Sequence, residues 1–284
     1  MLKRRTPSRC CAPPTASKAS LLVLLLVAGC AAAPAGGFAF GVFGDTPYNE
    51  SEVRRLDALI DDINADRLDF VVHVGDIGAR AGVCTDAWLE ARKRQLARIR
   101  HPLVVIPGDN EWTDCRDQEA RLLAWRGLFC AVPLAVERQP GEYCEHVRWQ
   151  AEGTLFVALH VVGSNNNVRN PHEYEPRLAA VLAWLDDSAT LAQKRRLRLV
   201  VLMHANPFVI VPRDGYGELR AKLARIGERM EGKVVLVHGD THTYHDDEPI
   251  PGVQRLEVWG SPIVAWHRGA VDDGVLRFSA PRYR

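Results

Sequence analysis

Short apolar runs rich in Val, Ile and Leu recur along the chain, and each ends in an acid or a histidine. There are five such runs, at residues 40–45, 71–76, 104–109, 199–204 and 234–240. Runs this short, without alternating polar residues, are typical of strands buried on both faces. Open α/β sheets bind ligands beyond the carboxyl ends of their strands, so we expect these acids and imidazoles to meet at one rim. A metal site is the leading hypothesis for that rim.

Helices are expected between these strands, the first of them on an apolar stripe with Ser51 as its cap. Their predicted ranges are 49–65, 86–100, 116–129, 173–193 and 215–230. Further strands are expected at 143–150, 154–162, 253–258, 263–266 and 275–278. The first two of these have no helix between them, so they should pair antiparallel. Strand–helix alternation with a β-rich end predicts an α/β core of two packed sheets.

Composition and charge are those of an ordinary globular protein. The chain has 284 residues, of which 47% are hydrophobic and 25% charged, and its formal net charge is +1. That length allows one large core, and no Gly/Ser-rich or charged linker interrupts the pattern. We therefore predict a single domain over residues 38–284. The nearly neutral charge gives no indication of a nucleic-acid-binding surface, which would be basic.

The N-terminus has the features of a targeting segment. Basic residues precede an apolar run at 21–28 that is too short to span a bilayer and has the form of a signal-peptide core. The run ends in Leu26-Val-Ala-Gly-Cys30, which resembles a bacterial lipobox. We expect a signal peptide over 1–29, then a tether over 30–37 anchored by lipid on Cys30. Cleavage at the Ala-rich segment 31–33, which would release a secreted soluble chain, is the alternative.

Export changes the interpretation of the cysteines. By resemblance to other lipoproteins, the lack of Asp after Cys30 points to the periplasmic side of the outer membrane. Four cysteines then remain in an oxidising compartment: Cys84, Cys115, Cys130 and Cys144. Three pairings are open, and we expect Cys84–Cys115 and Cys130–Cys144, since the first two each follow a strand that ends at the rim. A zinc cluster is disfavoured because there is no Cys-x-x-Cys.

Five sequence blocks at the strand ends resemble those of the calcineurin-like metallophosphoesterase family, which usually read D-x-H, G-D, G-N-H-E/D, H and G-H-x-H. In this chain they are Asp45, Gly75-Asp76, Gly108-Asp109-Asn110-Glu111, His204 and Gly239-Asp240-Thr241-His242. The resemblance covers residues 38–284. It implies a four-layer α/β/β/α sandwich with two mixed β-sheets that hold two metal ions.

The resemblance also implies a ligand set and a reaction. Asp76 would bridge the two ions, and the remaining ligands would be Asp45 and His242 on the first ion and Asp109, His204 and Asp240 on the second. Such a pair of ions hydrolyses phosphate mono- or diesters through a metal-bound hydroxide. Asp76, His204 and Asn110 are the expected catalytic residues. Because two neutral ligands of the family are carboxylates here, we expect Mn, Mg, Fe or Ca rather than Zn.

Two further positions depart from the family pattern. Pro47 stands where the family has a ligand histidine, which leaves the first ion one ligand short, and Tyr48 is close enough in sequence to replace it. Asn110 stands in place of the histidine that assists the leaving group, and an amide cannot act as an acid near neutral pH. His73, Glu111 and His245 are alternative proton donors. A hydrolase with one ion, or a degenerate metal- or ligand-binding lipoprotein, is therefore the competing hypothesis.

Residues around the rim are candidates for substrate contact. Asn165, Asn166 and Asn167 follow the strand predicted to end at 162, and their amides could donate hydrogen bonds to a phosphoester. Turn formation alone also explains a run of Asn, which tolerates left-handed backbone. Arg80 and Arg169 are weaker phosphate-binding candidates. We expect the partner to be a small-molecule or lipid-headgroup phosphoester.

Overall fold

The computed structural model describes residues 37–80, 84–272 and 274–284. The predicted signal peptide, the lipid-anchor site at Cys30 and the predicted tether up to residue 36 lie outside the described residues. No helix within these ranges combines the length and the apolar character needed to cross a bilayer.

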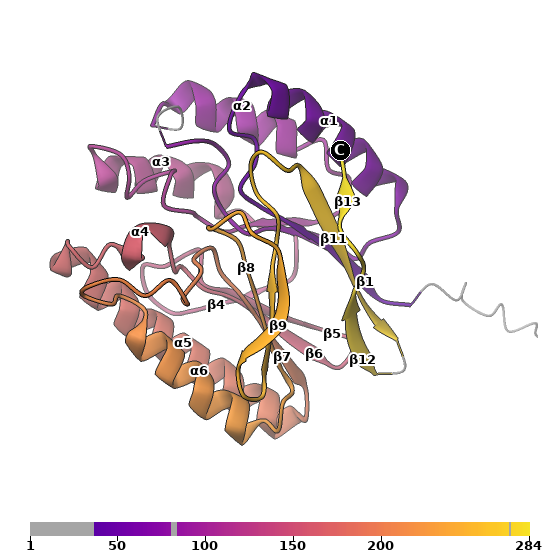
Figure 1. The fold of residues 1–284 in the computed structure, drawn as a ribbon, viewed down its shortest axis with the longest axis vertical. Helices are drawn as coiled ribbons and strands as arrows, with labels where there is room; N and C mark the ends of the chain where they lie inside the picture. Colours follow the sequence, from indigo (N-terminus) through magenta and orange to yellow (C-terminus); the bar gives the residue numbers. More distant parts are fainter. Residues whose placement is uncertain (1–36, 81–83, 273) are drawn as a thin grey trace, which may run out of the picture. The chain divides into compact units, whose positions relative to one another are not determined.

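Two β-sheets with helices on their outer faces form the described part of the chain (Figure 1). The strands of the first sheet, in spatial order, are β12 (Val275–Phe278), β11 (Ala265–Asp272), β1 (Ala39–Phe43), β2 (Phe70–His73) and β3 (Leu103–Val105), with β13 (Arg282–Tyr283) paired to β11. Those of the second are β4 (Glu137–Arg138), β5 (Val147–Ala151), β6 (Thr154–Ala158), β7 (Arg198–Leu202), β8 (Val234–His238), β10 (Val253–Glu257) and β9 (His245–Ile250).

Both sheets are mixed, as the resemblance implied. In the first, β1, β2 and β3 are parallel and β11 is antiparallel to β1. In the second, β6, β7, β8 and β10 are parallel, whereas β5 and β9 pair antiparallel at either side. The antiparallel pairing of β5 with β6 confirms the prediction from the missing helix between them. Within each sheet, the carboxyl ends of the parallel strands therefore lie along one edge.

Three hydrophobic clusters separate four layers. The cluster that includes Phe43, Leu56 and Trp266 packs the first sheet against α1 (Glu50–Ala65), α2 (Asp86–Leu96) and α3 (Gln118–Phe129). The cluster that includes Phe40 and Phe156 joins the inner faces of the two sheets. The remaining cluster lies under α5 (Pro171–Arg195) and α6 (Gly217–Arg229). This order of layers confirms the predicted α/β/β/α sandwich.

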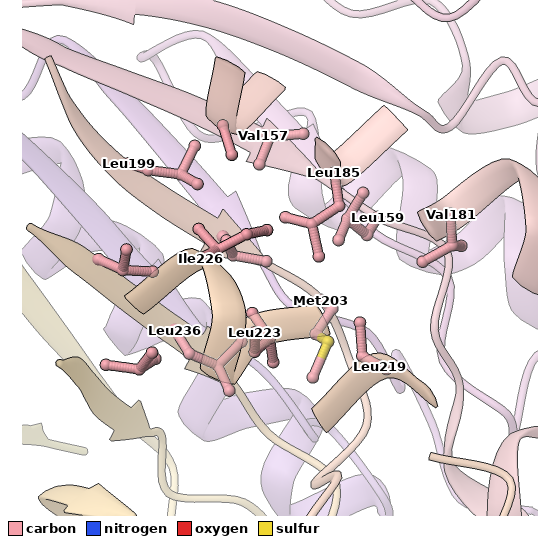
Figure 2. Close-up of a cluster of buried hydrophobic side chains, with 14 of the residues drawn as sticks. Val157, Leu159, Val181, Leu185, Leu199, Met203, Leu219, Leu223, Ile226 and Leu236 are labelled. Carbon is pink, nitrogen blue, oxygen red and sulfur yellow. The ribbon is translucent and has the colours of Figure 1, made fainter. Parts of the chain in front are cut away.

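Figure 2 shows the cluster between the second sheet and its two helices. Val157, Leu199 and Leu236 rise from three adjacent strands and meet Leu185 of α5 and Leu223 of α6. All five side chains are fully buried. Each such side chain contributes about 1.5–3 kcal/mol by leaving water, so this face holds β7 and β8 firmly beneath the loops that follow them.

Several element boundaries differ from the prediction. The cap of α1 is Asn49, whose side chain accepts a hydrogen bond from the Glu52 N–H, so the prediction of Ser51 was wrong. The helix α2 ends at Leu96 rather than at residue 100. The strand expected at 263–266 is the longer β11, which extends the first sheet beyond β1. The sequence did not predict β9, because this edge strand exposes three consecutive acidic residues and a proline, and it has no apolar pattern.

Two disulfides connect the cysteines as predicted. Cys84 is bonded to Cys115 and Cys130 to Cys144, with Cα–Cα distances of 5.6 and 5.7 Å. The first bond ties the segment before α2 to the segment before α3, and so joins the connections that follow β2 and β3. Disulfides of this kind are characteristic of chains that fold outside the reducing cytoplasm.

Candidate metal centre

The predicted metal ligands lie just beyond the carboxyl ends of parallel strands. Asp45, Asp76 and Asp109 follow β1, β2 and β3, while His204 and Asp240 follow β7 and β8. The carboxyl ends of these strands lie along one edge of each sheet, so the tertiary structure brings the five side chains together. His204 is fully buried, and the carboxylates of the other four residues are buried or nearly so.

His204 stands at the centre of this group. Its Nε2 lies 2.9 Å from Asp109 Oδ1, 3.5 Å from Asp76 Oδ1 and 3.8 Å from Asp240 Oδ1. Donor atoms of Asp109, His204 and Asp240 all fall within 4.8 Å of one another, and so do those of Asp45, Asp76 and His204. Metal–ligand bonds of about 2.0–2.4 Å place neighbouring donors about 3 Å apart, so both groups have the spacing of a coordination shell.

Asp45 has a buried carboxylate oxygen without a hydrogen-bond partner in the described part of the chain, which bears on whether these residues suit a cation. Asp45 is fully buried; its Oδ1 accepts a hydrogen bond from the Asp240 N–H at 3.0 Å, but its Oδ2 has no partner among the described residues. A buried carboxylate oxygen without a partner is strongly unfavourable unless a cation or a proton compensates it. A divalent ion would supply that compensation, so the donor set fits the metal that the resemblance implied.

Tyr48 lies among the residues predicted for the first ion. Its hydroxyl donates to Asp76 Oδ2 at 2.6 Å, accepts from Asn110 Nδ2 at 3.0 Å and lies 3.1 Å from His242 Nε2. His242 Nε2 is in turn 3.7 Å from Asp45 Oδ1. The phenol oxygen thus occupies the region where Pro47 leaves a donor missing.

The cluster holds more carboxylates than its one buried histidine can neutralise. Burial raises the pKa of Asp45 and of Asp76 well above the usual value, and it raises the pKa of Asp240 to about 6. Burial alone would lower the pKa of His204, but the surrounding carboxylates, Asp76 first, raise it well above its ordinary value. Burial alone would raise the pKa of Asp109, but the hydrogen bonds that its carboxylate accepts from His204 and Ser164 outweigh this effect and lower the pKa. In the absence of a cation, the protein must hold protons here.

Backbone conformation at the ligands is unusual. Asp45, Asp76, Asp240 and His242 have φ angles of 50°, 57°, 83° and 60°. Residues other than glycine rarely adopt this left-handed region, and such positions concentrate at functional sites. Close approach adds a second constraint at Gly163, where a Cβ atom would collide with the carboxylates of both Asp109 and Asp240.

Hydrogen bonds from the surrounding loops orient the ligands. His204 Nδ1–H donates to the Val74 carbonyl at 3.0 Å, which directs Nε2 toward the carboxylates. Ser164 Oγ donates to Asp109 Oδ2 at 2.8 Å, and the Asn206 N–H donates to Asp240 Oδ2 at 3.0 Å. These contacts restrict the rotamers of three candidate ligands before any ion binds.

The three alternative proton donors are engaged in other contacts. The buried Glu111 carboxylate accepts from the N–H groups of Ile77 and Gly108, so it links the loops after β2 and β3. His73 is fully buried, and its Nε2 lies 3.3 Å from the Thr46 carbonyl. His245 Nδ1 lies 2.8 Å from a Glu257 carboxylate oxygen.

The predicted substrate-binding asparagines form an uncommon left-handed turn. Residues 164–167, which include part of the short element α4 (Gly163–Asn166), all have positive φ. The Asn165 amide donates to the Arg213 carbonyl, the buried Asn166 amide to the Gly215 carbonyl, and the Asn167 amide to Glu173. All three amides therefore connect the turn to neighbouring segments. Asn165 and Asn167 also line a cavity that reaches Asp240, and substrate contact by the three asparagines stays a prediction.

Some residues of the site were missed by sequence reasoning. Gly163 could have been found, because it follows a predicted strand as Gly44 and Gly75 do. Ser164 and Asn206 carry no comparable signal, since one lies in a run that resembles an ordinary turn and the other in a Pro-containing loop. Gly260 was not predicted as part of the site either; a Cβ atom there would collide with Asp45 and His242.

Comparisons with known proteins agree with this architecture. The family model for calcineurin-like phosphoesterases matches residues 38–244. No curated protein shows significant sequence similarity to the chain.

Three similar solved structures show how widely the fold is shared. A dimetal phosphatase from Danio rerio is 14% identical with a TM-score of 0.62, and the match covers 86% of this chain and 96% of that one. GAP50, described as the anchor in the inner membrane complex of Plasmodium, is 13% identical with a TM-score of 0.56 over 86% and 84% of the two chains. A purple acid phosphatase from yellow lupin is 13% identical with a TM-score of 0.53 over 86% and 51%. At these identities the likeness establishes the fold.

Proposed function

The chain belongs to the calcineurin-like phosphoesterase family, and from that premise we propose that it hydrolyses phosphate mono- or diesters with two divalent metal ions. The proposed ligands are Asp45, Asp76, Asp109, His204, Asp240 and His242. The observation that carries the proposal is the buried convergence of four carboxylates on His204, together with the unpaired Oδ2 of Asp45. With so many oxygen donors, we expect Mn, Mg, Fe or Ca rather than Zn.

The proposed division of labour follows from the positions of the side chains. Divalent ions bound here would supply Lewis acidity to the phosphoryl group and to the attacking water. Asp76 would hold both ions in place, since its two oxygens face different neighbours, Tyr48 on one side and His204 on the other. Asn110 would donate a hydrogen bond to a phosphoryl oxygen through Nδ2. That amide now bonds to Tyr48 and to the Gly78 carbonyl, which fixes its orientation.

Tyr48 is proposed as the replacement for the missing histidine ligand. Its oxygen lies within hydrogen-bond distance of Asp76 and His242, two of the three residues assigned to the first ion. Burial, and after it the charge of Asp76, raises the pKa of the Tyr48 phenol above its ordinary value. Ligation therefore requires the cation to displace the hydroxyl proton to solvent. Oxygen at this position also favours a hard cation.

A second candidate function is metal or ligand binding without turnover. Pro47 and Asn110 favour it, because they remove a ligand and a proton donor that the family pattern contains. GAP50, an anchor according to its description, has the same fold, so the fold by itself does not decide between the two candidates.

The deciding experiment compares metal-stripped and reloaded protein. Full-length chain would be treated with a chelator, reloaded with Mn²⁺ and assayed on p-nitrophenyl phosphate and bis-p-nitrophenyl phosphate, with metal content measured in parallel. A hydrolase regains activity on reloading, and Asp76→Asn lowers kcat by at least about a hundredfold, the scale expected for loss of an electrostatic group in a reaction centre. Asp61→Asn, a surface acid paired with Arg98, serves as the matched control.

Each outcome selects one hypothesis. Bound metal without turnover of either ester selects the binding protein, and one ion per chain in an active preparation selects a single-ion hydrolase. Full activity and metal content in His204→Gln would refute the assignment of the second ion.

The location of the protein is also part of the proposal. The disulfides indicate a chain outside the reducing cytoplasm. We propose that residues 1–29 are a signal peptide and that Cys30 carries lipid, with a tether over 30–37 presenting the domain at 38–284 on the periplasmic side of the outer membrane. Metabolic labelling with a radioactive fatty acid tests this: Cys30→Ala should abolish the label, and a labelled variant would refute the assignment.

A further inference from the structure

We propose that the cavity beside the metal centre binds an apolar chain attached to the phosphoester, so that the substrate is an amphiphile. This inference rests on the proposed function, because the cavity matters for catalysis only if a phosphoester occupies the metal centre.

The cavity is continuous with the candidate ligands. It has a volume of about 1060 Å³, and Asp240 forms part of its wall together with Ser164, which bonds to Asp109. Its remaining walls come mainly from segments 113–118, 165–169 and 209–213, with Arg80, Tyr216 and Thr241. A ligand held by the metal centre would therefore extend directly into this space, which is as large as the sites that take drug-sized molecules.

One wall is apolar and open to solvent. Val168, Val209, Val211 and Pro212 line the cavity, and Ile210 adjoins them in the chain. Val209 is 41% exposed and Ile210 is 78% exposed. Among the residues that the structure describes, five large hydrophobic side chains are this exposed, and only these two are neighbours in sequence. Clustered exposed apolar residues at the rim of a cavity indicate a surface that a ligand covers.

The same cavity offers positive charge that the protein does not use. Arg169 and Arg213 line it, and neither has an acidic partner within 4.0 Å in the described ranges. Arg80, by contrast, pairs with Asp114 at 2.9 Å. Free guanidinium groups complement an anionic phosphoester, whereas the apolar wall complements a hydrocarbon chain. An amphiphilic ester satisfies both features at once.

A nucleotide or sugar phosphate fits the cavity less well. Tyr216 is the aromatic residue that lines the described cavity, but it is only 2% exposed and its hydroxyl donates to the Val162 carbonyl. It therefore offers no open face on which a base could stack. A sugar would leave Val209 and Ile210 in water.

The proposal can be tested by binding alone. Full-length protein loaded with Mn²⁺ would be titrated by calorimetry with n-alkylphosphonates of two, four, six and eight carbons, below their micelle concentrations. Because a phosphonate is not hydrolysed, the readout is independent of turnover. The Kd is expected to fall by up to about fourfold per added methylene, the change equivalent to about 0.8 kcal/mol for a fully buried group. Val209→Ser/Ile210→Ser should flatten the series, and Val275→Ser, at an exposed position that does not line the cavity, should not.

The outcomes separate this inference from the proposed function. Turnover of p-nitrophenyl phosphate with equal Kd values across the series overturns the cavity proposal alone. Chain-length-dependent binding without turnover of any ester keeps the cavity proposal and removes the hydrolase. If the double variant does not fold, Val209→Ser replaces it, since Val209 lines the cavity and is 41% exposed, and an unchanged slope in that variant overturns the proposal.

Discussion

Replacing Asp240 with Asn is expected to stabilise the metal-free protein while weakening its response to metal. Asp240 Oδ2 accepts from the Asn206 N–H at 3.0 Å, a bond that the carbonyl oxygen of Asn can keep. The other oxygen lies 3.8 Å from His204 Nε2, and Asn has the same shape. The substitution therefore removes one negative charge from the cluster with little change in packing.

The size of the effect follows from the pKa of Asp240, which burial raises from 3.8 to about 6. Because the folded-state pKa is above the unfolded one, the folded state carries a penalty at every pH above about 6. The penalty disappears as the pH falls through 6 towards 3.8. Two pH units correspond to about 3 kcal/mol, which is an upper bound on the stability that Asp240→Asn gains at pH 7 without metal.

Urea denaturation of chelator-treated protein at pH 7 and pH 4.5 measures this gain, which should shrink at the lower pH. Adding Mn²⁺ at a hundred times its Kd should stabilise the wild type by about 2.7 kcal/mol and the variant by much less. Asp61→Asn is the control, since that side chain is 72% exposed and pairs with Arg98 on the surface. A variant that is less stable than the wild type at pH 7 without metal, or equally stabilised by Mn²⁺, would refute the reasoning.

Three further predictions concern single side chains. Tyr48→Phe should reduce the metal bound per chain and, in protein loaded with Fe³⁺, abolish the visible phenolate-to-iron absorption that the wild type is expected to show; an unchanged spectrum contradicts ligation. Gly163→Ala should raise the Kd for Mn²⁺ by at least about tenfold, because its methyl group would displace Asp109 and Asp240, whereas Gly127→Ala in α3 meets no atom within 4 Å and should not. His146 is buried with its pKa lowered by burial to about 3, so between pH 6.5 and 4.5 the unfolded chain binds a proton that the folded chain does not. The wild type should therefore lose up to about 3 kcal/mol of stability over that interval relative to His146→Gln, and parallel pH profiles of the two would show that His146 does not titrate in this way.

The main elements could be predicted from sequence because burial on both faces leaves a direct trace. The runs at β1, β2, β7 and β8 are almost wholly apolar, as a strand covered by a helix layer and a second sheet must be. The edge strand β9 leaves no such trace, since solvent takes the place of a packing partner. Its residues resemble a loop, and only pairing with β10 makes them a strand.

The candidate site was predictable in part for a related reason. A small residue and an acid after a buried strand mark the point where the chain leaves the sheet, so the positions of Asp45, Asp76 and Asp109 could be placed on one rim. The same reasoning could suggest Tyr48 only by its closeness to Pro47. The contact of its hydroxyl with His242 joins residues 194 positions apart, and no local pattern encodes it.

The sequence by itself determined where the buried strands lie along the chain, the α/β class and the types of ligand, because hydrophobic burial and the chemistry of Asp and His act on each segment separately. The tertiary structure alone decided which oxygens approach His204, which glycines leave room for them and where the arginines and valines meet beside Asp240. Those features depend on distances between segments that are far apart along the chain. Such distances are fixed only when the two sheets have packed together.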